Sequence, residues 1–132
     1  MIKQLLLPIG SFLALFLLGF WIHDNYLVLA HINLPFSLEK SYLFHFLFSS
    51  LLIIHFEFLS RVKSAKPFLG IIYLVSVVLK IVLFAIVFKS VVIDQETLKL
   101  NTKYALLLPA LIFLLFEVVF VSKILLRKEP EY

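Results

Sequence analysis

The sequence predicts an all-α integral membrane protein, a four-helix bundle that forms a single domain over residues 1–132. Hydrophobic residues make up 63% of the chain and charged residues 15%, against roughly 25% charged residues in soluble domains. So few charges cannot build the water-exposed surface that a soluble domain of this size needs. The charged residues also divide the chain into four apolar stretches of about 20 residues, the length that crosses roughly 30 Å of hydrocarbon. We expect transmembrane helices at about 5–22, 42–60, 68–93 and 104–126.

The first span follows Lys3 and ends at Phe20 and Trp21, where a cleaved signal peptide would end in small residues. We therefore expect a retained membrane anchor. The connection after it, residues 23–41, contains an apolar run at 26–30. We expect this connection to lie in the membrane interface as a partly helical segment, with a lid or a partner-docking segment as the alternative.

The second span carries a polar stripe. At 100° per residue its polar side chains fall on one face of the helix, and Glu57 precedes Arg61 in the order that favours a helical ion pair. Small and polar residues are the kind that helices use to contact one another in lipid. The stripe therefore faces either the rest of the bundle or a partner protein. Its residues are Tyr42, Ser49, Ser50, Glu57, Ser60 and Arg61.

The third and fourth spans each carry an ionisable residue, Lys80 and Glu117, at a depth where a charge costs roughly 2.5–3.5 kcal/mol. The two helices run in opposite directions, and the two residues differ in depth by roughly 4–5 Å at 1.5 Å per residue. We therefore expect Lys80 and Glu117 to face the bundle interior and each other. They form either a buried ion pair that orients the two helices or the working groups of a proton or cation site.

The histidines do not predict a metal site. His23, Asp24 and His31 share one connection but lack the spacing that places ligands on one helical face. His45 and His55 lie ten residues apart, about 15 Å along a helix, which is too far for one ion. The chain has no cysteine and hence no thiolate ligand. We expect no metal and no cofactor, with His55 hydrogen-bonded inside the bundle and the other three histidines at the membrane interface.

The basic residues predict the orientation in the membrane, because short cytoplasmic connections carry an excess of Lys and Arg. One side of the predicted bundle has more of them and is therefore expected to be cytoplasmic, together with both termini. The basic residues of that side are Lys3, Arg61, Lys63, Lys66, Lys123, Arg127 and Lys128. Those of the other side are Lys40, Lys89, Lys99 and Lys103.

Residues 69–84 and 107–117 carry a mid-span lysine, a proline near a span start and an intramembrane glutamate. With Lys80, Pro109 and Glu117 as the discriminating residues, this half of the chain resembles a family of small bacterial four-helix membrane proteins encoded beside the genes of the F-type ATP synthase. That family is in turn similar to the ATP synthase protein I family, which is linked to assembly of the rotor ring and to supply of divalent cations. The resemblance implies a location in the bacterial inner membrane and a partner among the ATP synthase membrane subunits.

The sequence as a whole favours a non-catalytic, multi-pass inner-membrane protein that acts through intramembrane helix contacts, with assembly of the ATP synthase membrane sector as the implied role. The alternative is a small oligomeric transporter of protons or divalent cations that uses Glu57, Lys80 and Glu117. The chain has no glycine-rich phosphate loop and no Ser/His/Asp arrangement, so we expect no enzymatic activity. The expected partners are the lipid bilayer and either ATP synthase membrane subunits or a second copy of the chain. Nucleic acid is not expected, because the net charge of +4 lies on short connections.

Overall fold

The computed structural model describes residues 2–34, 36–89 and 100–126, and all regular structure in these ranges is helical. The predicted all-α fold is confirmed, since four of the described segments are long and apolar enough to cross a membrane. The protein is therefore a multi-pass membrane protein whose outer surface contacts the lipid bilayer. Its elements are α1 (Ile2–Ala14), a π-helical segment (Leu15–Gly19), α2 (Phe20–Leu29), α3 (Leu38–Leu59), a 3₁₀ turn (Lys66–Phe68), α4 (Leu69–Val87) and α6 (Leu100–Leu126).

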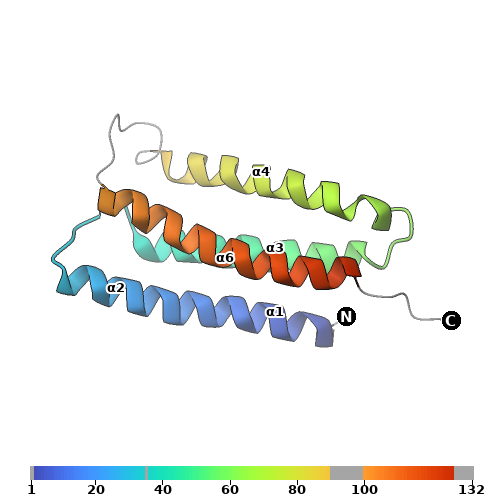
Figure 1. Ribbon diagram of the computed structural model, residues 1–132, viewed down its shortest axis with the longest axis horizontal. Coiled ribbons are helices and arrows are strands. Elements are labelled where there is room, and N and C mark those ends of the chain that lie inside the picture. Colours follow the sequence, from blue (N-terminus) through green and yellow to red (C-terminus); the bar gives the residue numbers. More distant parts are fainter. Residues whose placement is uncertain (1, 35, 90–99, 127–132) are drawn as a thin grey trace.

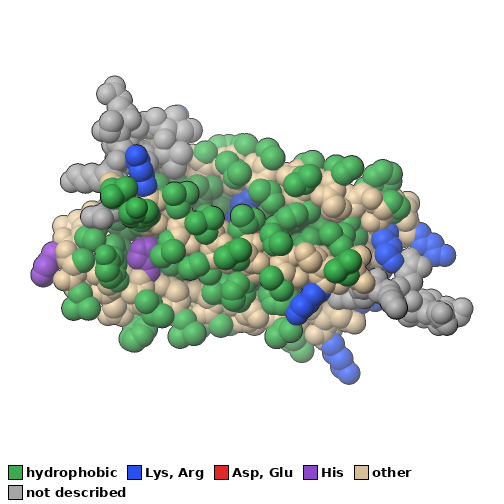
Figure 2. All heavy atoms as spheres, in the orientation of Figure 1, with side chains coloured by type: hydrophobic (Ala, Val, Ile, Leu, Met, Phe, Trp, Pro, Cys, Tyr) green, Lys and Arg blue, Asp and Glu red, His purple; other side chains and the backbone are tan. Residues whose placement is uncertain are grey.

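α1, the π-helical segment and α2 form one continuous rod, and the rod, α3, α4 and α6 run antiparallel to one another in chain order (Figure 1). α3 and α6 lie between α4 on one side and the rod on the other. The start of α1, the link between α3 and α4, and the end of α6 meet at one end of the bundle. Most of the Lys and Arg side chains visible on this face gather at that same end, while hydrophobic side chains cover the middle (Figure 2). This distribution matches a bundle whose long axis crosses the bilayer.

The first helix is longer than the sequence predicted. It continues as one rod from Ile2 to Leu29, so the first seven residues of the expected connection, 23–29, belong to the helix. The rod ends in a Schellman motif, in which Ile32 N donates to Leu27 O at 2.9 Å and His31 N donates to Val28 O at 3.2 Å. His31 takes the left-handed conformation, with φ of 54°, that this motif usually assigns to glycine. No glycine or proline marked this end, which is why hydropathy alone placed it too early.

The other helix ends differ less from the prediction. α3 begins at Leu38, four residues earlier than expected, because the Ser37 hydroxyl accepts a hydrogen bond from Lys40 N at 3.3 Å and caps the helix. α4 ends at Val87, and residues 90–93 of the predicted third span lie outside the described residues. α6 ends at Leu126, as predicted.

The core of the bundle is aromatic and lies between α1, α3 and α6. The Phe12 ring stacks on Phe113, with ring centroids 6.1 Å apart, and meets Phe120 edge-on at 5.7 Å. Tyr42 closes the core toward α2, where the absence of a side chain at Gly19 lets the Tyr42 ring approach the helix backbone. His23 Nδ1 lies 3.1 Å from the Tyr42 hydroxyl. Because lipid is as apolar as these rings, packing and dispersion rather than exclusion of water hold the helices together.

Candidate functional site

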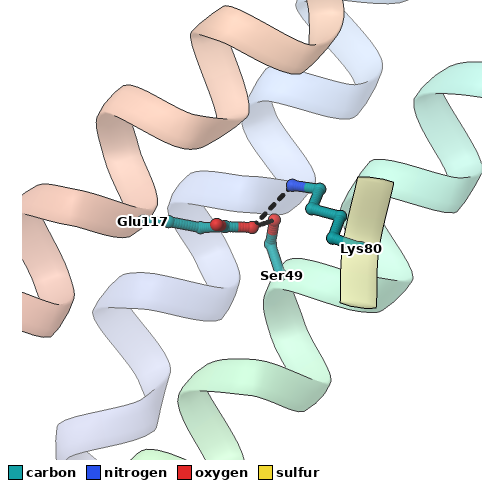
Figure 3. Close-up of polar contacts among 3 residues, drawn as sticks. All are labelled: Ser49, Lys80 and Glu117. Atoms are coloured by element: carbon teal, nitrogen blue, oxygen red, sulfur yellow. Dashed lines mark hydrogen bonds and ion pairs between the residues drawn. The ribbon is translucent and has the colours of Figure 1, made fainter. Parts of the chain in front are cut away.

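A polar cluster at the middle of the bundle joins three helices. Lys80 of α4 donates from Nζ to Oε1 of Glu117 on α6 at 2.7 Å, and the same oxygen accepts a hydrogen bond from the Ser49 hydroxyl of α3. All three side chains point toward one another in Figure 3. They are also buried, with 6% of Lys80, 1% of Glu117 and none of Ser49 exposed. The structure thus brings together the two ionisable residues that the sequence singled out and adds one member of the polar stripe.

This arrangement compensates most of the cost of placing charges in hydrocarbon. The carboxylate of Glu117 receives two donors, and the Lys80 ammonium lies 5.6 Å from the centre of the Phe48 ring as a cation–π contact. Such a pair gains little net stability, but breaking it leaves an uncompensated buried charge. The cluster therefore acts as a fixed polar tie between α4 and the two central helices.

The polar stripe of α3 faces the bundle interior over most of its length. Its last two residues, Ser60 and Arg61, lie at one end of the bundle. Ser49, Ser50 and Glu57 are buried, whereas Ser60 is half-buried and Arg61 is exposed. Arg61 Nη2 lies 4.0 Å from Glu57 Oε2, the i,i+4 ion pair, and the Ser60 hydroxyl donates to the Glu57 carbonyl oxygen at 2.8 Å. Of the two orientations left open, the structure has the stripe facing the bundle interior.

The expected placement of the histidines in α3 was wrong. His55 is exposed and hydrogen-bonds the Leu51 carbonyl oxygen at 2.7 Å, while His45 is buried between the rings of Phe84 and Phe113, with centroids 5.3 and 5.9 Å away. The helical period explains the exchange. His45 lies one turn from Tyr42 and one from Ser49, on the inward face, whereas His55 lies roughly 200° from Glu57 around the helix.

The sequence did not predict three further polar residues as possible site members, namely the buried Ser41 and His45 and the half-buried Tyr73. Ser41, His45 and Tyr73 each carry a buried polar atom that has no hydrogen-bond partner among the described residues, as does Ser50. Ser41 and His45 continue the i,i+4 register of Ser49 toward the start of α3, which is the signal that could have found them. In the part of the chain that the structure describes, no three His, Asp or Glu side chains are grouped so that they could hold a metal ion.

Comparison with known proteins gives a family and no function. No curated protein and no solved structure matches the chain. The family that does match is described as a family of unknown function, DUF6168, and this description carries no link to ATP synthase. The match covers residues 1–128 and thus all four helices of the bundle. The protein therefore belongs to the DUF6168 family.

Proposed function

We propose that the protein is a non-catalytic membrane protein of the bacterial inner membrane that acts by offering one helix, α4, to a partner within the bilayer. The observation that carries this proposal is the exposure of α4. Within α4 only Leu69 and Lys80 are buried. Six large apolar side chains along the same helix are each 61–65% exposed, namely Ile71, Leu74, Val75, Val78, Ile81 and Ile86.

The buried ion pair supports this role for α4. A helix that only filled the bilayer would need no lysine at its centre, because the charge makes insertion costly. Lys80 instead fixes which side of α4 turns to Glu117, so that the opposite side is presented in one orientation. A surface that is already oriented loses less freedom when a partner binds.

This mechanism differs from one in which the polar stripe or the ion pair itself meets the partner. Ser49, Ser50 and Glu117 are buried in the bundle, so a partner helix would have to separate α3 and α6 to reach them. The outer side of α4 needs no such rearrangement. The contact that we propose is therefore apolar. The polar cluster does not touch the partner and only orients α4.

The partner that we propose first is a membrane subunit of the F-type ATP synthase, with the protein as an accessory or assembly factor. This narrower proposal depends on the resemblance at Lys80, Pro109 and Glu117 to a family encoded beside ATP synthase genes. Association with a second copy of the chain is the other outcome that the experiment below distinguishes.

Crosslinking along α4 tests the proposal. Because the chain has no cysteine, a single cysteine can be placed at each position from 71 to 86 and labelled with a photoactivatable group in native membranes. We expect protein crosslinks that recur with the helical period and centre on Val78, which lies on the side away from Lys80. Leu18→Cys, 61% exposed on the other side of the bundle, is the matched control and should crosslink only lipid. Lipid crosslinks at every α4 position would contradict the proposal, and mass spectrometry of the crosslinked product identifies the partner.

We further propose that both termini are cytoplasmic. The basic residues near the ends of α1, α3 and α6 support this, because Lys3, Arg61 and Lys123 belong to helix ends that meet at one end of the bundle. A membrane-impermeant maleimide should label Asn33→Cys in intact spheroplasts and Ser64→Cys only after lysis. The reverse pattern would contradict this orientation.

Ion transport is the second candidate function. Buried polar residues at several depths favour it, with Ser41 and His45 near the start of α3, the ion pair at the middle and Glu57 near the end. The apolar Ile53, fully buried between Ser49 and Glu57, speaks against a continuous path. Purified protein in liposomes should then move protons or divalent cations, and Glu117→Gln should abolish the flux. If this flux were observed, it would displace helix contact as the primary function.

A further inference from the structure

A groove lies between α4 and α6, beside the outer side of α4. Its volume is about 530 Å³, within the range of pockets that hold small molecules. The molecule is visibly hollowed between these two helices in Figure 2. Its walls are formed almost entirely by apolar side chains, including Phe84, Ala85, Ala110 and Leu114. Such a groove is open to molecules that are dissolved in the bilayer.

Three polar side chains also line this groove, Lys103 at one end of it and His45 and Lys80 farther in. Neither His45 nor Lys80 has all of its hydrogen-bonding capacity used. His45 is 2% exposed, and neither of its ring nitrogens has a hydrogen-bond partner among the described residues. A neutral imidazole carries one N–H donor and one acceptor, and leaving them unmet in a buried site is costly. Lys80 has three N–H donors, of which one binds Glu117. The groove thus combines an apolar surface with unmet hydrogen-bonding groups of His45 that are buried at its inner wall.

The charge balance selects the kind of ligand. At the inner end of the groove Lys80 and Glu117 together carry no net charge, and the remaining cation of the lining, Lys103, lies at the opposite end. An anionic head beside the ion pair would therefore be an unbalanced charge in hydrocarbon. A pure hydrocarbon would leave His45 unsatisfied. An uncharged carbonyl group accepts a hydrogen bond from His45 or Lys80 without adding charge. We propose that this groove binds an uncharged, membrane-soluble carbonyl compound, with its carbonyl at His45 and Lys80 and its apolar tail along α6.

The length of the groove sets the size of the tail. Its lining on α6 extends from Lys103 to Leu114, which is roughly 16 Å at 1.5 Å per residue. A carbonyl head followed by an extended chain of about ten to twelve carbons fills this length. Lys103 is exposed near the start of α6 and marks the end of the groove that lies toward the headgroup layer. A ligand with its carbonyl at His45 and Lys80 would therefore have the end of its tail near Lys103.

Two chemical sources provide such a group, a quinone ring and the ester of a neutral glycerolipid. Direct binding to the purified protein in detergent distinguishes them, with a decyl-substituted benzoquinone and dioctanoylglycerol as probes and dodecanoate as the anionic comparison. We expect one neutral probe to bind and dodecanoate to bind at least tenfold more weakly. Binding of the benzoquinone alone assigns the site to quinones, and binding of dioctanoylglycerol alone assigns it to ester lipids.

Two variants test the geometry. His45→Phe keeps the stacked ring and removes both nitrogens, and Ala110→Phe fills the groove; each should lower affinity for the neutral probe at least tenfold. His55→Phe on the exposed side of α3 and Ala14→Phe on the exposed side of α1 are the matched controls and should bind as the wild type does. Circular dichroism and gel filtration verify that each variant is folded. The proposal is overturned if neither neutral probe binds, if dodecanoate binds as well as they do, or if both groove variants retain full affinity.

Discussion

α3 and α4 both contribute to the polar cluster, but α3 lies at the centre of the bundle and α4 lies at its edge. α3 buries ten of its side chains, five of which are Ser, His or Glu, whereas α4 buries only Leu69 and Lys80. α4 is nevertheless the more hydrophobic of the two. Of these two helices, the more hydrophobic one therefore lies against lipid, and the one with more polar side chains lies inside beside the aromatic core, because water is absent from both environments.

The comparison also shows what fixes each helix in place. α3 contacts its neighbours through close packing along most of its length, with Ile53 fully buried and Phe56 1% exposed. α4 has few such contacts, and its best-defined link to the rest of the bundle is the bond from Lys80 to Glu117. Substitutions that remove packing should therefore affect α3 strongly and α4 weakly, with Lys80 as the exception.

The largest effect on stability should come from replacing Lys80. Lys80→Met leaves the Glu117 carboxylate buried without its cation, and we expect the free energy of unfolding to fall by about 3 kcal/mol. The double variant Lys80→Met with Glu117→Gln has no buried charge, and the new amide can still meet Ser49. It should lie within about 1 kcal/mol of the wild type. Unfolding in mixed detergent micelles, followed by circular dichroism, measures both, and equal losses would refute the pairing.

A matched pair of isoleucines separates packing from lipid exposure. Ile53→Ala in α3 removes a side chain that is fully buried, and we expect a loss of about 2 kcal/mol in the same unfolding assay. Ile81→Ala in α4 removes one that is 64% exposed, and lipid replaces the lost contacts, so the change should stay within about 0.5 kcal/mol. Similar losses at the two positions would mean that α4 is packed against a second copy in the detergent-solubilised protein.

Substitutions at two glycines compare a packed position with an exposed one, and we expect smaller changes in stability there. A Cβ at Gly19 would lie 3.0 Å from Cε1 of Tyr42, whereas one at Gly70 in α4 meets nothing within 4 Å. Gly19→Ala should lose about 1–2 kcal/mol, because the Tyr42 ring of α3 must move away from His23. Gly70→Ala should be neutral or gain about 0.5 kcal/mol from its better helix propensity. A stabilising Gly19→Ala would show that Tyr42 can move at little cost.

Much of this architecture could be predicted from the sequence, because bilayer thickness and charge placement leave few alternatives. The charged residues divide the chain at nearly the right places. The depth argument put Lys80 and Glu117 at similar levels, and in the structure their charged atoms lie 2.7 Å apart.

What the sequence could not supply depends on contacts between helices. The end of the first helix depends on a left-handed backbone at His31, which hydropathy does not record. Which way the polar stripe of α3 faces depends on the helix that packs against it. The sequence does not identify that helix, and the fold shows that it is α6. The positions of His45 and His55 follow from the helical period, which places His45 on the inward face with Tyr42 and Ser49 and turns His55 away from it. The groove is formed by two helices and has no counterpart in the sequence of either one.

The smallest predicted effect concerns His45, the buried histidine of α3, and its exposed counterpart His55. His45→Phe replaces a ring that has no described hydrogen-bond partner with one that stacks on Phe84 and Phe113 equally well. Without ligand we expect the free energy of unfolding to rise by about 1 kcal/mol, because the unmet nitrogens are removed. His55→Phe should change it by less than about 0.5 kcal/mol, since that side chain is exposed. A stabilising substitution at the wall of the groove would mean that His45 lowers the stability of the free protein. That is the behaviour expected of a residue whose hydrogen bonds are made only with a ligand, and a clear loss of stability would instead indicate that its nitrogens already have a partner in the bundle.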